Sequence, residues 1–245
     1  MIERPQERWW KATGSRPQIY ICTQSCRARC TFCSTYLIHG RAVSRPVDLV
    51  SADLDYILDE FGHDSIQFHD DDILQHTEFD RLMDLLASKG ATWSCNARSE
   101  FITRERAEQM FAAGCRRIFL GLESLDQQSL DYYHKATTVE MNQEAVRLLD
   151  AVGIGVVAGY IIGAPHDTLD SALADLDRLM DLPIYFLSAA ILPPDIGTVE
   201  YLRARKEIPA LRLLGDDGGK FNLKPRPDLF GTAPPYGFPT VSRAL

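Results

Sequence analysis

The sequence has no run of basic residues, no basic stripe with interleaved aromatics and no long apolar run. Lysine and arginine number 26 against 34 aspartates and glutamates, a formal net charge of −8. A nucleic-acid partner needs a basic patch or stripe to neutralise phosphates, so this balance argues against one. No stretch approaches the roughly 18 apolar residues of a membrane span, and residues 1–14 lack the apolar core of a signal peptide. We therefore expect a cytoplasmic protein without a nucleic-acid or membrane partner.

Cysteine is present, but not in the pattern of a disulfide-stabilised protein. Of six cysteines in 245 residues, Cys26, Cys30 and Cys33 lie within eight positions. Disulfide frameworks are typical of small secreted domains, whereas bunched cysteines in a larger chain of a reducing compartment indicate a metal site or catalysis. The length and the 45% hydrophobic content fit one larger globular domain. The sequence shows no internal repeat and no low-complexity tract.

Short β-rich apolar segments alternate with longer segments of helical periodicity. The pattern predicts strands at 18–22, 65–69, 92–96, 117–121, 155–162 and 185–192. It predicts helices near 47–61, 76–89, 103–113, 138–152 and 168–182. Helix starts are expected near Ser51, Thr103 and Thr168, and helix ends at Gly90, Gly114 and Gly153. Six strands that alternate with helices predict an α/β fold with a parallel sheet, whose chemistry lies at the carboxyl ends of the strands.

The chain divides into a lead-in at 1–17, a βα domain at 18–205 and a tail at 206–245. The tail is rich in glycine and proline, and we expect it to be irregular. Two interpretations of the tail stay open. Tyr236 and Phe238 could close over the active end of the sheet as part of a lid, or the tail packs on the surface.

The three-cysteine loop directly follows the first predicted strand, where a parallel sheet keeps its active site. A structural zinc site takes four ligands, and this set has three. A four-iron cluster held by three thiolates keeps one iron open to an external chelating molecule. The alternatives are three incidental thiols, or a zinc site completed by His39 or Cys22.

With Phe32 directly before the last cysteine, Cys26-x3-Cys30-x2-Cys33 resembles the signature of the radical S-adenosylmethionine (radical SAM) superfamily. The resemblance implies a partial (β/α)6 TIM-like barrel of the radical SAM type. It also implies that the three cysteines bind a [4Fe-4S] cluster, that the open iron chelates S-adenosyl-L-methionine, and that Phe32 contacts the cofactor. Reduction by an external flavodoxin- or ferredoxin-like donor would release a 5′-deoxyadenosyl radical, which abstracts hydrogen from a substrate.

Three adjacent carboxylates, Asp70, Asp71 and Asp72, follow the second predicted strand. They would repel one another unless a cation or an ammonium group lies near. The run resembles the paired-aspartate motif of the cobalamin-associated branch, which implies a contact with the ammonium group of the cofactor. Which aspartate makes that contact, or whether only a backbone carbonyl does, stays open. The alternative is a solvated acidic turn that caps the next helix.

Later strand ends carry further polar residues. Asn96 and Arg98 share one face by the period of two, and that face could meet ribose hydroxyls and a carboxylate. Glu123 suits a bidentate grip on a ribose diol. By resemblance, Lys135 pairs with the methionine carboxylate, although a solvated surface lysine is the alternative. Also by resemblance, the glycine-rich strand that ends at Ile162 lets the backbone approach the adenine.

The similarity spans about residues 18–202 and ends in a segment, 192–198, that resembles the Pro-Gly-Thr segment of the same branch. Only about 25 residues precede the cysteine loop, so we expect no cobalamin-binding domain. We predict that the enzyme abstracts hydrogen from a small molecule in natural-product or cofactor biosynthesis. The result would be an epimerisation, a rearrangement or a cyclisation of that molecule. The alternatives are methyl transfer with cobalamin from a partner chain, and a non-catalytic zinc or iron–sulfur module. Cys22 or Cys95 is either a hydrogen donor or a buried structural thiol.

Overall fold

Six parallel strands form the central sheet of the computed structural model, which describes residues 17–60, 62–191 and 195–207. The sheet order is β1-β4-β5-β6-β7-β8, and every neighbouring pair is parallel. The strands are β1 (Pro17–Tyr20), β4 (Ser65–Phe68), β5 (Thr92–Ala97), β6 (Cys115–Glu123), β7 (Gly155–Ile162) and β8 (Phe186–Ile191). Within the described residues β1 and β8 do not pair with each other, so the barrel is open. The predicted partial barrel of the α/β class is confirmed.

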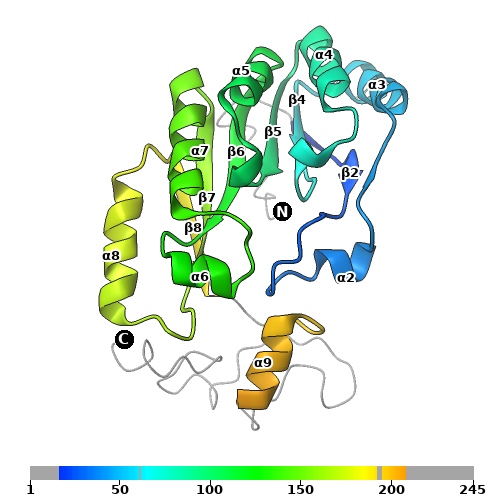
Figure 1. Ribbon diagram of the computed structural model, residues 1–245. Coiled ribbons are helices and arrows are strands. Elements are labelled where there is room, and N and C mark those ends of the chain that lie inside the picture. The colour runs from blue at the N-terminus through cyan, green and yellow to red at the C-terminus, as the bar shows by residue number, and fades with distance from the viewer. Residues whose placement is uncertain (1–16, 61, 192–194, 208–245) are drawn as a thin grey trace, which may run out of the picture.

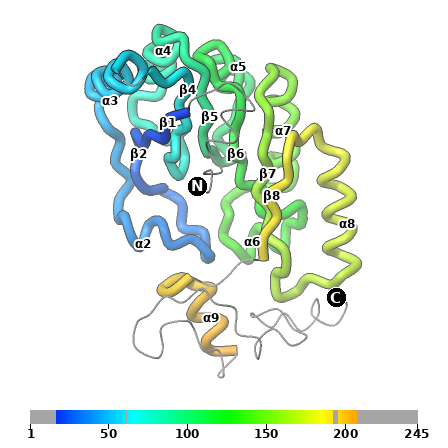
Figure 2. Tube along the Cα trace, turned by 180° about the vertical axis from the view of Figure 1, so that it is seen from behind, coloured from blue at the N-terminus to red at the C-terminus, as the bar shows by residue number. Residues whose placement is uncertain are grey.

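Helices follow the strands and cover the outer face of the sheet (Figures 1 and 2). These helices are α3 (Val47–Asp55), α4 (Phe79–Lys89), α5 (Arg104–Ala112), α7 (Val139–Val152) and α8 (Leu169–Met180). Alternate strand residues such as Ile118 and Leu120 are fully buried in the core shared with these helices, as are Leu82 and Val146. Burial of such side chains supplies most of the stabilisation of an α/β layer, about 1.5–3 kcal/mol each.

Local capping chemistry sets several helix ends where the sequence predicts them. The Thr103 and Thr168 side chains accept hydrogen bonds from backbone N–H groups in the first turns of α5 and α8. Gly90 and Gly153 follow α4 and α7 with φ of 68° and 92°, a conformation that glycine adopts without the steric cost of a Cβ. The prediction for Ser51 is wrong, because α3 begins after Pro46 and Ser51 lies inside it.

Other predicted bounds also differ from the structure. The strand predicted at 18–22 ends at Tyr20, and the strand predicted at 117–121 runs from Cys115 to Glu123. The helix predicted from residue 76 begins at Phe79, because a separate 3-10 turn, Ile73–Gln75, precedes it. The helix predicted over 47–61 is α-helical only to Asp55 and continues as a π-helical turn, η1 (Tyr56–Glu60).

The sequence analysis misses several short features, and two of them belong to the segment that carries the cysteines. A two-stranded ribbon, β2 (Thr23–Gln24) with β3 (Val43–Ser44), closes the base of the cysteine segment, which also contains α2 (Thr35–His39). A further hydrogen bond of 2.8 Å, from Ser25 Oγ to the Gly40 carbonyl, braces this segment. We call residues 23–44 the cysteine lobe. Also missed are the helices α6 (Gln127–Tyr132) and α9 (Val199–Glu207) and the 3-10 turn η3 (Ser99–Phe101).

Several predicted segments lie partly or wholly outside the residues that the structure describes. Helix α9 crosses position 206, where the sequence analysis begins the tail. Residues 208–245, with Tyr236 and Phe238, lie outside the described residues, as do 1–16 and the start of the 192–198 segment. Among the helices of the described residues, none has both the length and the apolar character that crossing a membrane requires.

Candidate functional site

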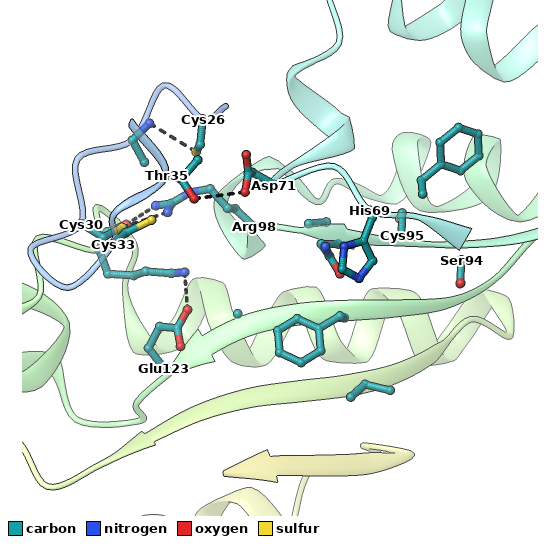
Figure 3. A pocket seen from close by; sticks show the side chains of 18 of the residues that line it. Cys26, Cys30, Cys33, Thr35, His69, Asp71, Ser94, Cys95, Arg98 and Glu123 are labelled. Carbon is teal, nitrogen blue, oxygen red and sulfur yellow. Dashed lines mark hydrogen bonds and ion pairs between the residues drawn. The ribbon is translucent and has the colours of Figure 1, made fainter. Parts of the chain in front are cut away.

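The three cysteines lie at the carboxyl end of the sheet, on the rim of a cavity of about 580 Å³ (Figure 3). The cavity extends from the cysteine lobe along the inner face of β4, β5, β6 and β7. Besides the cysteines, its walls include Phe32, Thr35, Tyr36, Gln67, His69, Asp71, Ser94, Asn96, Arg98, Arg117, Phe119, Gly121, Glu123, Lys135 and Val157. The connection of β1 to the lobe therefore places three thiols where all the central strands end.

Two of the three sulfur atoms accept hydrogen bonds from the surrounding chain. Cys26 Sγ accepts from the Ala28 backbone N–H at 3.4 Å and from Gln75 Nε2 at 3.2 Å. Cys30 Sγ accepts from Arg98 Nη1 at 3.2 Å. Burial raises the pKa of the Cys26 thiol, and a bound metal would oppose that shift by stabilising the thiolate.

Gln75 links the second strand end to the cysteine lobe. Its Nε2 donates to Asp72 Oδ2 at 2.8 Å as well as to Cys26 Sγ, and its Oε1 accepts from the Arg27 N–H at 2.9 Å. Asp72 also caps the 3-10 turn by accepting from the Leu74 N–H at 3.1 Å. The sequence analysis misses Gln75, although a polar residue on a short turn after a strand end is a usable signal. Asp72 acts on the lobe through Gln75.

Arg98 is buried at the end of β5 and joins three parts of the site. Its Nε pairs with Glu100 Oε1 at 2.5 Å, and its Nη1 donates to Cys30 Sγ. Its Nη2 donates to the backbone carbonyl of Lys135. The guanidinium therefore contacts a cysteine sulfur directly, and its positive charge lies where a thiolate would carry negative charge.

The buried Lys135 forms an ion pair with the partly buried Glu123 at the cavity wall, with 2.8 Å between Nζ and Oε1. Two features of β6 create space for it. The ladder with β7 shifts register between Gly121 and Glu123, and Glu123 takes a φ of 64°, which is uncommon outside glycine. A Cβ on Gly121 would lie 2.5 Å from Glu123 Oε1 and 2.9 Å from Lys135 Nζ, so glycine leaves room for the pair.

The three adjacent aspartates point in different directions. Asp70 is fully buried, and its Oδ1 accepts from the Cys22 N–H at 3.1 Å and from the Thr23 N–H. Burial raises the pKa of Asp70 to about 6, and also that of Asp72. Asp71 alone lines the cavity and accepts from Thr35 Oγ1 at 3.2 Å. The Asp70 backbone carbonyl accepts from Asn96 Nδ2 at 2.8 Å.

Nine of the twelve residues that the sequence analysis assigns to the cofactors line one cavity. They are the three cysteines with Phe32, Asp71, Asn96, Arg98, Glu123 and Lys135. Asp70, Asp72 and Ile162 lie outside that lining, and Ile162 packs against the hydrophobic core from the end of β7. Cys22 and Cys95 are buried in the same core, and Cys95 also borders the cavity. The sequence analysis does not identify His69, Phe119 or Thr35 as lining residues.

The donor set fits a four-iron cluster with three protein ligands. All six cysteines are free, and three of them share one lobe whose neighbours donate hydrogen bonds to sulfur. In the part of the chain that the structure describes, no three His, Cys, Asp or Glu side chains converge as ligands of a single metal ion. A four-iron cluster would not need such convergence, because each of its three cysteine ligands would bind a different iron.

Fold and site together define a partial α/β barrel that presents three cysteines at the active end of its sheet. The Radical SAM superfamily model matches residues 20–179, and the chain belongs to this enzyme superfamily. Members use a [4Fe-4S] cluster and S-adenosyl-L-methionine, act on small molecules and require a reductant.

Relatives and solved structures agree with this assignment. The chain is 26% identical over 195 residues to an uncharacterized methyltransferase of Pyrococcus horikoshii, covering 77% of this chain and 42% of that protein. It is 29% identical over 184 residues to the bacteriochlorophyllide d C-12(1)-methyltransferase of Chlorobaculum tepidum, covering 73% and 40%. The fold matches the radical S-adenosylmethionine methyltransferase TsrM of Kitasatospora setae with a TM-score of 0.71 at 16% identity, covering 84% and 41%. The chain thus spans less than half the length of these proteins.

Proposed function

We propose that this chain binds a [4Fe-4S] cluster through Cys26, Cys30 and Cys33, and uses it with S-adenosyl-L-methionine to abstract hydrogen from a small molecule. The observation that carries the proposal is that three cysteines share one cavity with charged and amide side chains from consecutive strand ends. When bound, the two cofactors supply a strongly oxidising carbon radical. The chain supplies binding, orientation and exclusion of water, in the reducing cytoplasm that its free cysteines suit.

The cavity offers complementary charges for a zwitterionic nucleoside. Lys135 Nζ presents a cation for a carboxylate, and Glu123 presents an acceptor for ribose hydroxyls. Asp71 and the backbone carbonyl of Asp70 lie near the cysteine lobe and suit an ammonium group. The ion pair of Lys135 with Glu123 keeps both charges compensated until the cofactor binds.

The part of the cavity away from the cysteines would receive the substrate. His69 and Ser94 lie in that part (Figure 3). Arg117, which pairs in register with Ser94, and Phe119 also line the cavity. An aromatic ring beside hydrogen-bonding groups suits a small polar molecule with an apolar portion, such as a sugar, a nucleoside or another biosynthetic intermediate.

The test is anaerobic reconstitution followed by reduction with S-adenosyl-L-methionine, with iron content and 5′-deoxyadenosine as readouts. Alanine at Cys26, Cys30 or Cys33 should reduce both readouts to background, because each thiolate holds one iron. Cys115→Ala is the matched control, because Cys115 is a buried cysteine of the core and does not line the cavity. An iron-free folded wild-type chain, or full cleavage by a variant of the trio, would refute the proposal.

Methyl transfer is the second candidate, and the methyltransferase names of the two relatives favour it. It would need cobalamin in addition to the groups that the cysteines hold. Incubation with methyl-labelled S-adenosyl-L-methionine, methylcobalamin and pools of candidate metabolites separates the two reactions. Labelled methyl in a product supports transfer, whereas deuterium that passes from a labelled metabolite into 5′-deoxyadenosine supports hydrogen abstraction.

A further inference from the structure

The cysteine lobe carries a concentration of positive charge that contrasts with the rest of the chain. Residues 25–44 contain three arginines, Arg27, Arg29 and Arg41, and no aspartate or glutamate, in a chain of net charge −8. All three arginines are exposed, and none lines the cavity. Binding of the cofactors therefore does not account for this charge.

The same lobe exposes apolar side chains beside those arginines. No side chain of α2 is buried, and Leu37 and Ile38 are 48% and 71% exposed. Val43 on β3 is 60% exposed. Apolar residues with a cationic border, arginine above all, are typical of protein interfaces. We call this surface, formed by Arg27, Arg29, Leu37, Ile38, Arg41 and Val43, the basic face.

Hydrogen bonds and a cation–π contact within the lobe fix the conformation of the basic face. Arg29 Nη1 donates to the backbone carbonyl of Ala28 at 2.9 Å, and its guanidinium lies 4.8 Å from the centre of the Tyr36 ring. Three acidic side chains contact the lobe: Asp71 through Thr35, Asp195 through Ser34, and the buried Asp70 through the Thr23 N–H group. Arg45, just outside the lobe, pairs with Asp53 at 2.7 Å, which is why we exclude it from the face.

We propose that the basic face docks an acidic one-electron carrier protein that reduces the cluster. The proposal rests on the proposed function, since it requires the bound cluster. Arg27 and Arg29 are the direct neighbours of Cys26 and Cys30 in the chain, so a carrier seated here comes close to the cluster. Complementary charge accelerates such encounters, and redox complexes are typically small and transient.

The electron transfer balances without a further reactant. The flavin hydroquinone anion of a reduced flavodoxin loses one electron and becomes the neutral semiquinone. The cluster gains that electron, and no proton moves. A small carrier interface suits this reaction, because the carrier must leave before the next electron arrives.

The test measures the rate at which flavodoxin hydroquinone reduces the reconstituted cluster, by anaerobic stopped flow at low and high salt. The double substitution R27E/R41E should lower the second-order rate constant at low salt at least about tenfold. High salt should remove most of that difference, because it screens exposed charges. The matched control is R104E/R147E, because Arg104 on α5 and Arg147 on α7 are also exposed but belong to the helices of the outer face.

A second reductant separates failure of docking from failure of the site. Photoreduced deazaflavin is small and uncharged, so it should reduce wild-type and R27E/R41E clusters equally. Equal flavodoxin rates in the wild type and in R27E/R41E, with normal deazaflavin reduction, would overturn the docking proposal alone. A cluster that neither reagent reduces, or that does not assemble, would refute the proposed function instead. A wild-type dimer that R27E/R41E disrupts would assign the face to a second copy and also overturn the proposal.

Discussion

Gln75 is an uncharged side chain in direct contact with one of the three cysteines. It donates a hydrogen bond to Cys26 Sγ at 3.2 Å, and Asp72 orients its amide. A donor to a ligating thiolate stabilises the reduced, more negative cluster, so it raises the reduction potential. We predict that Gln75→Leu lowers the midpoint potential of the bound cluster by about 40 mV, which corresponds to about 1 kcal/mol for one electron.

An anaerobic redox titration followed by EPR measures that shift. Gln143→Leu on α7 is the control, because Gln143 does not line the cavity. An unchanged potential in Gln75→Leu, at normal iron content, would show that the hydrogen bond to Cys26 does not tune the cluster.

Asp70 gives a prediction about pH. Burial raises its pKa to about 6 in the folded chain, above the value of about 3.9 of an exposed aspartate. Between these values the folded state holds more protons than the unfolded state, so stability falls as the pH rises. In Asp70→Asn, the amide oxygen of the new side chain can still accept from the Cys22 and Thr23 N–H groups without a buried charge. This variant should therefore be more stable than the wild type at pH 7, by about 1–3 kcal/mol, and converge with it near pH 4.

Urea unfolding of the cluster-free chain under anaerobic conditions, between pH 4 and pH 8, measures this difference. Asp84→Asn is the control, because Asp84 is exposed on α4. A difference between Asp70→Asn and wild type that does not change with pH would contradict the assigned cause.

Strand β6 provides the space that the ion pair of Glu123 with Lys135 occupies. Gly121→Ala would bring a Cβ to 2.5 Å from Glu123 Oε1 and 2.9 Å from Lys135 Nζ, so the ion pair must shift. We expect weaker binding of S-adenosyl-L-methionine, together with a loss of about 1–3 kcal/mol in stability from overpacking. Gly155→Ala is the matched control, because a Cβ on that strand glycine stays at least 3.6 Å from its neighbours.

Isothermal titration of the reconstituted protein with S-adenosyl-L-methionine gives the dissociation constant for both glycine variants. If Gly121→Ala and Gly155→Ala bind the cofactor equally well, the ion pair of Glu123 with Lys135 does not contribute to that binding site.

In the molecule as a whole, the exposed arginines of the basic face and the cavity lie away from the helices of the outer face. The outer face of the sheet is covered by helices (Figure 1), whereas the cavity and the cysteine lobe lie at the carboxyl end. An acidic chain would on average repel an acidic carrier, so orientation must come from the local positive field of the basic face. The comparison of R27E/R41E with R104E/R147E tests this distribution, because both variants have the same net charge.

The fold class is determined by local signals that the sequence carries. The alternation of apolar strands with periodic helices predicts the parallel sheet, and capping residues such as Thr168 and Gly153 predict helix ends. The spacing of Cys26, Cys30 and Cys33 predicts the family, which the superfamily match confirms. These features are readable because each depends on residues close together in the chain.

Contacts between residues far apart in the chain depend on the tertiary structure and could not be predicted from the sequence. The hydrogen bond of Arg98 to Cys30 joins positions 68 residues apart, and that of Gln75 to Cys26 joins positions 49 apart. Asp70, Asp71 and Asp72 are adjacent in the sequence. The turn after β4 places the Asp71 side chain at the cavity and buries that of Asp70. The short α2 and the β2–β3 ribbon also escape prediction, because segments of two to five residues have almost no periodicity and depend on packing.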